Sequence, residues 1–597
     1  MAKAKPTKAS SSPVTEQLGP RPRLVKLSVR NFRCIGQSPV VVDLDDIVVL
    51  VGPNNVGKSS VLKAYEVIMS EGSKEGELTL EDFPGAKIDT DHLPEIELET
   101  VVFDNSPGEE WICTTSGGEK LVREKWTWLA PGKPKRLGFN VHLGRWAQDG
   151  DSELVPWGAP GVANSRRPQP HRVDAFASPE EQARAIVKLL MSALQERVKA
   201  YQATPSDGNP SEFGLLLDRV AELQKKIVAE ATSQISTIES ALTAQIERVF
   251  PGHKVVFDAK PEDSLEKTVS FFKADAQLLM GPQDGHLSTL DRQGSGARRT
   301  LLWVAIRLLA EAGAAKKDLS SQRPFVLLLD EPEICLHPDA IREACDLLYG
   351  LPQATGNWQV MVTTHSPCFV DFARDHTSVV RVERLPTGGI TGTTIFRPAT
   401  ANFVADDRAL LKLLNACDPY VAEFFFGGHT VLVEGDTEYT AFQHVIANEP
   451  HRYGAVHIVR ARGKATLVAL AKILNQFGAP YAVLHDSDRP TYRKAGKDVN
   501  NPAWTLNTSI RSEVSKATSG TRLVASVPNF EAAYLGEEAR SEKPYSALKV
   551  LRSEGEALSR VSSLLHALVD FAQPLPKGAA EWNALDELEK LVSLAGG

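Results

Sequence analysis

A glycine-rich segment near the N-terminus constrains the fold of this chain more than any other part of it. An apolar run from Ile47 to Val51 leads into GPNNVGKS, and the helical pattern SSVLKAYEVI follows. A strand, a glycine-rich turn and a helix form the context in which such a loop wraps phosphates with its backbone N–H groups. The segment therefore predicts an α/β domain that binds ATP and magnesium, in which Lys58 reaches the β- and γ-phosphates and Ser59 the metal ion. The residues of this loop expected around the nucleotide are Asn54, Asn55, Gly57, Lys58, Ser59 and Ser60.

Two apolar strands far downstream end in polar groups that suit the same site. The run FVLLL leads into Asp330 and Glu331, and the run MVTT leads into His365. Asp330 is expected to hold magnesium, commonly through water, and Glu331 to polarise the attacking water, because one carboxylate does not perform both tasks well. A lone histidine is more often structural, but this position at a strand end allows His365 to contact a γ-phosphate.

The order of these motifs resembles that of ATP-binding-cassette (ABC) ATPases. Between the phosphate loop and the acidic strand that family carries a signature loop that opens a helix. The best candidate is RQGSGARR, with Gly294, Ser295 and Gly296, although it departs from the LSGGQ form. The resemblance implies a homodimer in which the signature of one subunit closes on the nucleotide of the other. The glutamine of the family's Q-loop is not identified.

A helical insertion separates the phosphate loop from this signature. Its start, Ser178-Pro179-Glu180-Glu181, combines an N-cap serine, a proline at the first helical position and a glutamate three residues after the serine. Apolar residues then recur every three or four positions from about Leu215 to Val249, which indicates one long helix. This helix either packs on its own domain or forms an arm for dimerisation. An arm at this place resembles the chromosome-maintenance and recombination branch of the family and not the membrane transporters.

A second group of acids follows strand-like runs in the C-terminal third of the chain. Glu434 ends the run TVLV, a glycine after it permits a tight turn, and Glu438 lies about one helical turn further on. Asp486 and Asp488 end the run YAVLH, with side chains on the same side of an extended chain, so that two oxygens can grip one cation. Glu531 lies in the apolar context VPNFE.

These five acids cannot share a pocket without large pKa shifts unless cations are present. Two divalent ions, Mg²⁺ or Mn²⁺, would supply four of the five positive charges required, and Lys543 is the candidate for the remainder. Two oxygen-ligated ions suit phosphodiester hydrolysis, since one activates water and the other stabilises the leaving oxygen. Scattered surface acids are the alternative interpretation. Nearby basic residues either position phosphates or form a solvated face; they are Arg460, Arg462, Lys464, Arg489, Arg493, Lys494 and Lys497.

The strand-ending glutamate, the glycine and the later DxD pair resemble the Toprim domain of topoisomerases, primases and some nucleases. Behind an interrupted cassette ATPase, this domain makes the chain similar to the overcoming-lysogenization-defect (OLD) family of ATP-dependent nucleases. Glu438, the NFE element and the pair Lys543-Pro544 resemble that family's two-metal pattern and favour its class with a longer Toprim region. The resemblance implies DNA as the substrate and phage defence as a plausible context.

The expected site residues follow from both lines of argument. The catalytic set is Glu331 and His365 in the ATPase, and Glu434, Asp486, Asp488 and Lys543 in the nuclease. The metal ligands are Ser59 and Asp330 at the nucleotide, where one ion is expected, and at the Toprim site, where two are expected, Glu434, Glu438, Asp486, Asp488 and Glu531.

Composition limits the setting and the function class. A net charge of -8 argues against coating nucleic acid by bulk electrostatics but leaves room for a local basic groove. The six cysteines form neither a CxxC pair nor a regular spacing, so we expect a reducing cytoplasm and no zinc-binding element of the kind a primase would bring. The chain has no apolar run of about 18 residues, so we expect neither a membrane span nor a signal peptide.

The sequence thus predicts an α/β chain, an ABC-type P-loop ATPase with a helical insertion, followed by a Toprim domain with additional helices. The expected parts are a disordered tail at 1–21, the ATPase at 22–170 and 251–400, the insertion at 171–250, a linker at 401–427, the Toprim domain at 428–545 and a helical segment at 546–597. The expected function is an ATP-hydrolysing, metal-dependent DNA endonuclease or nickase whose ATPase regulates or positions cleavage. The alternative is an ATP-driven DNA clamp whose Toprim domain binds DNA or a partner without cutting.

Overall fold

The computed structural model describes most of the chain outside the predicted insertion. It covers residues 22–173 and 324–595 apart from gaps at 356–357, 373, 375, 386–388, 479, 495–496, 537–541 and 554. Between 174 and 323 it describes residues 178–184, 186–187, 219, 279–280, 286–299, 301–302 and 305–306. The predicted tail at 1–21 and nearly all of the predicted long helix from 215 to 249 lie outside the described residues. The chain divides into two compact units, Met1–Ala175 with Ser320–Gly597 and Phe176–Leu319.

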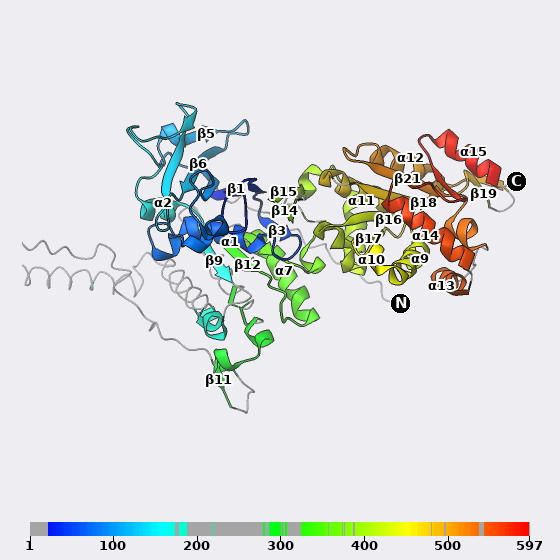
Figure 1. The fold of residues 1–597 in the computed structure, drawn as a ribbon, viewed down its shortest axis with the longest axis horizontal. Coiled ribbons are helices and arrows are strands. Elements are labelled where there is room, and N and C mark those ends of the chain that lie inside the picture. The colour runs from blue at the N-terminus through cyan, green and yellow to red at the C-terminus, as the bar shows by residue number, and fades with distance from the viewer. Residues whose placement is uncertain are drawn as a thin grey trace, which may run out of the picture. The chain divides into compact units, whose positions relative to one another are not determined.

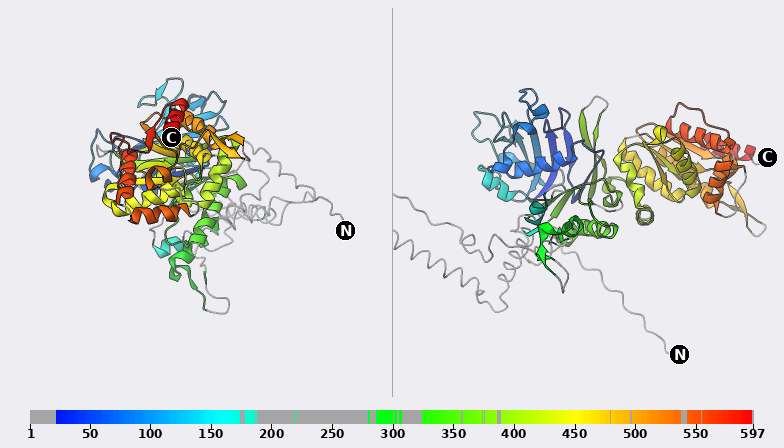
Figure 2. Two further views of the ribbon diagram at one scale, coloured as in Figure 1. Left: turned by 90° about the vertical axis from the view of Figure 1, so that its right-hand side faces the viewer. Right: turned by 60° about the horizontal axis from the view of Figure 1, so that its bottom comes forward.

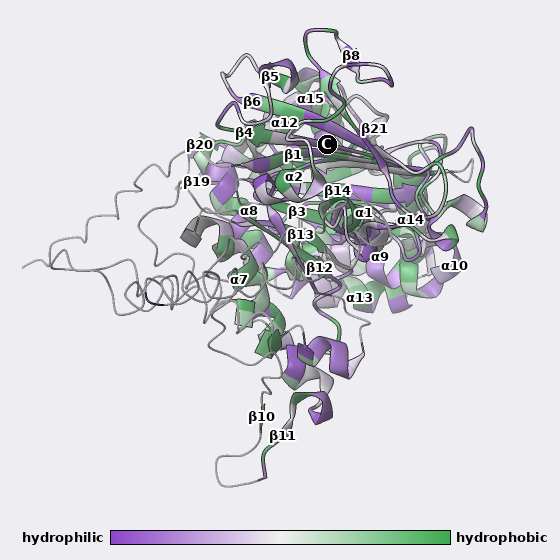
Figure 3. Ribbon diagram, turned by 90° about the vertical axis from the view of Figure 1, so that its left-hand side faces the viewer, coloured by the Kyte–Doolittle hydropathy of each residue, from purple (hydrophilic) through white to green (hydrophobic). Residues whose placement is uncertain are grey.

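The first unit contains a large mixed sheet whose central strands are parallel (Figure 1). Five neighbours run in the same direction, in the order β9 (Gln169–Val173), β12 (Phe325–Asp330), β13 (Trp358–Thr363), β3 (Ile47–Val51) and β14 (Thr377–Arg384). All residues of β3 and β13 are buried, as expected for parallel strands covered on both faces. Figure 3 shows hydrophobic residues gathered in this part of the sheet.

Two helices follow strands of the parallel part of the sheet, as in other phosphate-binding α/β folds. Helix α1 (Lys58–Met69) follows β3 and contacts β9, β12 and β13, while α7 (Pro338–Thr355) lies in sequence between β12 and β13. Strand β9 continues to Val173, so the ATPase sheet extends three residues beyond the boundary predicted at 170. The carboxyl ends of β3, β12 and β13 therefore meet at one edge of the sheet.

The remaining strands of this sheet extend it on the other side of β14. They are β15 (Ile390–Phe396), β2 (Val40–Asp43), β1 (Arg23–Arg30), β4 (Glu95–Val102), β6 (Lys120–Thr127), β7 (Lys135–Asn140) and β8 (Arg145–Trp146), with β5 (Ile112–Thr114) beside β6. From β1 to β8 they pair antiparallel. The segment 107–170, for which the sequence indicates only β-rich or irregular structure, forms β5 to β8 and helix α2 (Pro160–Arg166).

The C-terminal part of the same unit has its own sheet of five strands. Its order is β17 (Val456–Arg460), β16 (His429–Val433), β18 (Tyr481–Asp486), β21 (Thr521–Ser526) and β22 (Ala579–Glu581), with only β22 antiparallel. Six of its helices form two groups by their mutual contacts; they are labelled in Figure 1, and Figure 2 shows this part from two further sides. The first group is α9 (Asp436–Asn448), α10 (Pro450–Tyr453), α13 (Lys543–Ser553) and α14 (Gly555–Val569), and the second is α11 (Lys464–Phe477) and α12 (Pro502–Val514).

One hydrophobic core spans the boundary predicted at residue 545. Val431 and Leu484 from the strands pack in the same cluster as Val561 and Leu564 from α14. Helix α15 (Leu585–Ala595) ends the described chain. The segment 546–597 therefore contributes to the core of the C-terminal sheet and to its edge strand β22.

The segment 401–427, predicted as a linker, contains helix α8 (Ala405–Cys417) and a turn with buried phenylalanines. Buried Arg381 of β14 donates hydrogen bonds to the carbonyl oxygens of Phe424 and Phe425. Lys472 of α11 donates to Asp407 of α8 at 2.6 Å. These contacts tie the segment to the strands that precede it and to the helix that follows.

The second unit is described only in part. The predicted helix start at Ser178 is present, because the Ser178 hydroxyl accepts from the Glu181 backbone N–H at 3.2 Å and the Glu181 carboxylate accepts from the Ser178 N–H at 2.9 Å. Strands β10 (Leu279–Met280) and β11 (Ser288–Thr289) form a short antiparallel pair. Across all described residues, no helix has both the length and the apolar character needed to cross a membrane.

Candidate functional site

The phosphate loop lies between β3 and α1, as the sequence predicts. Gly52 and Gly57 have φ values of 137° and 95°, in the region that favours glycine. A Cβ atom on Gly52 would lie 2.0 Å from the carbonyl oxygen of Val382, so no larger residue fits there. Lys58 is buried, and its Nζ donates to the carbonyl oxygens of Gly52 at 3.0 Å and Pro53 at 2.8 Å. The ammonium group therefore lies directly over the loop.

Asp330 at the end of β12 joins the loop through Ser59. The Ser59 hydroxyl donates to Asp330 Oδ1 at 2.9 Å, and the Thr363 hydroxyl donates to the same oxygen at 2.5 Å. A hydroxyl and a carboxylate held this way are the donors that a nucleotide-bound magnesium ion uses in P-loop proteins. The donor set fits the ion, and Ser59 and Asp330 would hold it.

Glu331 and His365 lie together above the loop. The Glu331 backbone N–H donates to the Thr363 carbonyl oxygen, and a Glu331 carboxylate oxygen lies 3.4 Å from His365 Nε2. His365 Nε2 also lies 2.9 Å from Lys58 Nζ. Burial, with the nearby Lys58 charge, lowers the pKa of His365, and burial also lowers the pKa of Lys58. A neutral His365 therefore accepts the hydrogen bond from Lys58.

Three residues missed by the sequence analysis support this arrangement. Thr363 bonds to Asp330, and Glu333 accepts hydrogen bonds from the Thr364 hydroxyl at 2.8 Å and the His365 backbone N–H at 2.7 Å. Arg172 of β9 lies 3.8 Å from Asp330 Oδ2. Thr363 and Glu333 lie next to the predicted strand-end motifs, whereas Arg172 lies in β9, a strand that the sequence pattern does not predict.

The signature candidate belongs to the second unit. Residues 295–299 are helical, and the Arg298 backbone N–H donates to the Gly294 carbonyl oxygen at 3.2 Å. Gly294, Ser295 and Gly296 thus lie where a loop opens a helix, as predicted. Their relation to a nucleotide stays a prediction.

The C-terminal acids gather at the carboxyl ends of two neighbouring parallel strands. Glu434 follows β16, and Asp486 ends β18. The Asp486 backbone N–H donates to Glu434 Oε2 at 3.1 Å, and Asp486 Oδ1 accepts from the Phe530 N–H at 2.8 Å. Because β16 and β18 pair in parallel, their ends bring the two carboxylates to the same edge of the sheet.

Two further acids, Glu438 and Glu531, interact electrostatically with this pair. Both side chains are buried; Glu438 lies in the first turn of α9, and Glu531 accepts from the Thr437 hydroxyl at 3.1 Å. The predicted lysine, Lys543, lies 3.3 Å from Glu531 Oε1 and is half-exposed. The structure therefore brings Lys543 to the cluster through Glu531.

Burial and mutual repulsion disturb the acid–base behaviour of these carboxylates. Burial, reinforced by the charges of Glu434 and Glu531, raises the pKa of Glu438 from 4.5 to about 7. Burial raises the pKa of Asp486 well above its usual value, with Glu438 and Glu434 adding to the effect, and burial also raises the pKa of Glu434. Without cations, part of the cluster therefore holds protons near neutral pH.

Asp488 pairs with Lys464, one of the basic residues that the sequence places near this site without a defined role. Lys464 Nζ is buried, forms an ion pair with Asp488 Oδ2 and donates to Asn507 Oδ1 at 2.8 Å. Asn507 in turn donates to the Ser487 carbonyl oxygen at 2.9 Å. The lysine that balances the DxD pair is thus Lys464, while Lys543 balances Glu531.

The spacing of the acids bears on how many ions they could hold. Among the described residues, one group of three side chains brings its ligand atoms within 4.8 Å of one another, and it is Asp45, Asp46 and His376, outside both sites. None of the five predicted acids belongs to it, so no three of these described side chains bring their ligand oxygens within 4.8 Å of one another. Their oxygen-only donor set fits Mg²⁺ or Mn²⁺.

The predicted basic residues divide into two classes. Arg460 pairs with Asp418 at 2.8 Å and with Asp436 at 3.0 Å, and Lys464 is buried against Asp488. The others are exposed: Arg462, Arg489, Arg493, Lys494 and Lys497. Only the second class is fully open to solvent.

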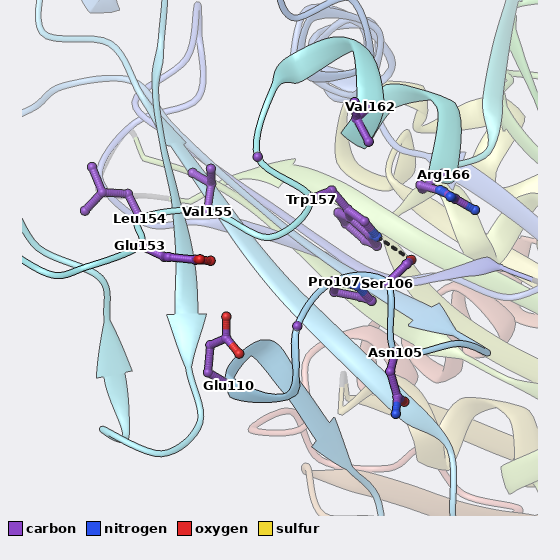
Figure 4. Close-up of a pocket in the computed structure, with 12 residues that line it drawn as sticks. Asn105, Ser106, Pro107, Glu110, Glu153, Leu154, Val155, Trp157, Val162 and Arg166 are labelled. Atoms are coloured by element: carbon purple, nitrogen blue, oxygen red, sulfur yellow. Dashed lines mark hydrogen bonds between the residues drawn. The ribbon is translucent and has the colours of Figure 1, made fainter.

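A surface cavity of about 640 Å³ lies in the antiparallel part of the large sheet (Figure 4). Trp157 lines it and donates from Nε1 to the Ser106 hydroxyl at 2.9 Å, and Glu110 and Arg166 also lie at its wall. None of the predicted site residues lines this cavity, and it is separate from both sites.

Comparisons with known proteins agree with the prediction of an ATPase domain followed by a Toprim domain. A family described as an AAA ATPase domain matches residues 23–112 and 178–370, and one described as the TOPRIM domain of overcoming lysogenization defect protein-like proteins matches residues 425–488. The Old nuclease of Escherichia phage P2 is 23% identical over 78% of this chain and 77% of its own length. The OLD nuclease of Thermus scotoductus is 22% identical over 89% of this chain and 95% of its own.

Solved structures similar to this chain include an Smc head bound to the C-winged helix domain of ScpA. It is 17% identical, with a TM-score of 0.34, and the match covers 63% of this chain and 98% of that one. The SMC head domain from Thermotoga maritima is 14% identical with a TM-score of 0.27, covering 63% and 99%. The predicted resemblance to the OLD family and the predicted α/β fold class are confirmed: the chain joins a P-loop ATPase domain to an OLD-like TOPRIM domain.

Proposed function

We propose that this chain, an ATPase domain joined to an OLD-like TOPRIM domain, is an ATP-hydrolysing, divalent-metal-dependent DNA endonuclease or nickase. The observation that carries the proposal is the approach of Glu438, in α9, to Glu434 and Asp486 at the ends of neighbouring strands, where the pKa values of all three carboxylates are raised. Fixed carboxylates that repel one another bind divalent cations well. The two relatives named as nucleases support the choice of DNA cleavage over other metal chemistry.

At the nuclease site, we assign each residue a role by its contacts. Glu434, which accepts from the Asp486 backbone N–H, would hold one ion together with the Asp486 carboxylate and Glu438. Glu531, paired with Lys543, and Asp488, paired with Lys464, would serve a second ion. Bound ions would activate water and stabilise the leaving oxygen of the phosphodiester. Lys543 is half-exposed beside Glu531, which leaves its ammonium accessible to a phosphate.

At the nucleotide site, the residues divide the work of hydrolysis. Lys58 would bind the β- and γ-phosphates, and the backbone from Asn54 to Ser60 would wrap them. Glu331 would orient the attacking water, and neutral His365 would donate or accept a hydrogen bond at the γ-phosphate. We propose that the two sites act in a homodimer in which Gly294, Ser295 and Gly296 of one subunit complete the nucleotide site of the other.

Conversion of supercoiled plasmid to nicked circles tests the proposal. The wild-type chain should nick plasmid in Mg²⁺ or Mn²⁺ and should not nick it in EDTA. Each metal condition is assayed both with and without ATP. Glu434→Ala should abolish nicking while ATP hydrolysis continues. The matched acid removal Asp586→Ala, at an exposed position of α15, should leave both activities intact. Nicking by Glu434→Ala at the wild-type rate would reject the nuclease site and leave the DNA clamp as the better account.

A further inference from the structure

A β-hairpin projects from the C-terminal part immediately after the DxD pair. Its strands β19 (Thr491–Lys494) and β20 (Lys497–Asn500) form a separate two-stranded sheet, labelled in Figure 3. Asn501 anchors its base by donating from the backbone to Pro490 and from the side chain to Arg489. The first strand thus begins three residues after Asp488, which fixes the hairpin beside the proposed cleavage site.

All eight residues of the two strands are exposed. A two-stranded hairpin is marginally stable by itself in water, and packing on neighbouring elements normally supports it. Here both faces of the strands are open to solvent, and the apolar pair Tyr492 and Val499, directly opposite in register, is 43% and 39% exposed. The hairpin therefore offers its side chains outward instead of contributing to a core.

The hairpin is strongly basic on a chain whose net charge is -8. Lys494 and Lys497 are register partners across the ladder, and like charges placed directly opposite destabilise a strand pair. Arg493 lies 4.0 Å from Asp498, but both side chains are largely exposed, so this ion pair contributes little. The repulsion between the lysines is a cost that a bound polyanion would relieve.

We propose that this hairpin binds the phosphate backbone of duplex DNA on one side of the cleaved bond. The inference rests on the proposed nuclease function and adds the element that holds the substrate. The lysines and Arg493 would contact phosphates, and Tyr492 would contact a sugar face through its ring. Backbone contacts of this kind position a duplex without reading its sequence.

Fluorescence anisotropy of a fluorescein-labelled 30-base-pair duplex, measured in EDTA so that no cleavage occurs, tests the proposal. The variant Arg493→Gln/Lys494→Gln/Lys497→Gln should bind about tenfold or more weakly at 100 mM salt, and the slope of log Kd against log salt should fall by about 2 to 3. Tyr492→Ser should weaken binding without changing that slope. Because the hairpin is exposed and the triple substitution removes the repulsion between Lys494 and Lys497, the thermal unfolding temperature of each variant should not fall below that of the wild type.

A matched control separates local contact from overall charge. Lys74→Gln/Lys87→Gln/Lys133→Gln removes the same three charges from exposed positions in the ATPase part and should keep the wild-type slope. An equal loss in this control, or a hairpin variant with the wild-type slope, would overturn the hairpin assignment. If the wild type nicks plasmid in those same preparations, the proposed function survives that result; a wild type that neither binds nor nicks DNA defeats both.

Discussion

Replacing Glu438 with glutamine should change how the stability of the metal-free protein depends on pH. Glu438 is buried beside Glu434 and Glu531, and its pKa rises from 4.5 to about 7 on folding. The folded state therefore binds this proton more tightly than the unfolded state, and stability falls as pH rises from 4.5 to 7. At 1.36 kcal/mol per pKa unit, the loss attributable to this group is about 3 kcal/mol.

This loss can be measured by urea unfolding in EDTA at several pH values between 5 and 7.5. Hydrogen exchange in peptides from β16 and β18 reports the unfolding of this part of the chain. The wild type should lose stability across the window, and Glu438→Gln, which cannot ionise, should show a profile flatter by about 2 kcal/mol between pH 5 and 7.5. Asp486 titrates in the same direction, so some pH dependence should remain in the variant. Saturating Mn²⁺ should stabilise the wild type more at pH 7.5 than at pH 5, because metal binding favours the ionised carboxylates.

Glu556→Gln, which neutralises an exposed glutamate on α14, provides the control and should keep the wild-type profile. If Glu438→Gln and the wild type lose the same stability between pH 5 and 7.5, then Glu438 is ionised throughout that range. The claim that these carboxylates crowd one another at neutral pH would then be refuted.

Other substitutions test the nucleotide site and the DxD support separately. Lys58→Ala removes the ammonium over the phosphate loop and should lower ATP turnover by about 100-fold or more, measured as phosphate release; unchanged turnover would contradict the P-loop assignment. Glu331→Gln should bind ATP but hydrolyse it about 100- to 1,000-fold more slowly in single-turnover assays, and a normal rate would exclude Glu331 as the water-orienting group. Lys464→Met leaves Asp488 unpaired and a buried Asn507 oxygen without its donor. The free energy of unfolding of the C-terminal part should therefore fall by about 2 to 4 kcal/mol, measured by urea unfolding. A decrease under about 1 kcal/mol would show that Lys464 does not support this site.

The strand-ending motifs were predictable from sequence because they depend on local order. An apolar run followed by Asp330 or Asp486 indicates a buried parallel strand with its functional group at the carboxyl end, and both strands form as predicted. Because neighbouring strands pair in parallel, their carboxyl ends lie at the same edge of the sheet. The geometry of Ser59 with Asp330 and of Glu434 with Asp486 follows from that topology.

The pairing of charges was not predictable in the same way. Lys464 and Lys543 are each the first residue of a helix, and no local pattern indicates that Lys464 is buried against Asp488 while Lys543 lies beside Glu531. Strand β9 carries Arg172 in the sequence QPHRV, which lacks an apolar run, and its pairing with β12 joins residues 156 positions apart, such as Gln169 and Phe325. Such tertiary contacts decide positions that sequence periodicity leaves open.

The most direct test of the central claim is anomalous diffraction at the manganese edge from crystals of the full chain grown with Mn²⁺. The account predicts two peaks at the strand ends, one contacting Glu434 and Asp486 and the other on the side of Glu531 or Asp488, and their loss in Asp486→Ala. No peak at these carboxylates, or manganese bound at Asp45, Asp46 and His376 alone, would contradict it.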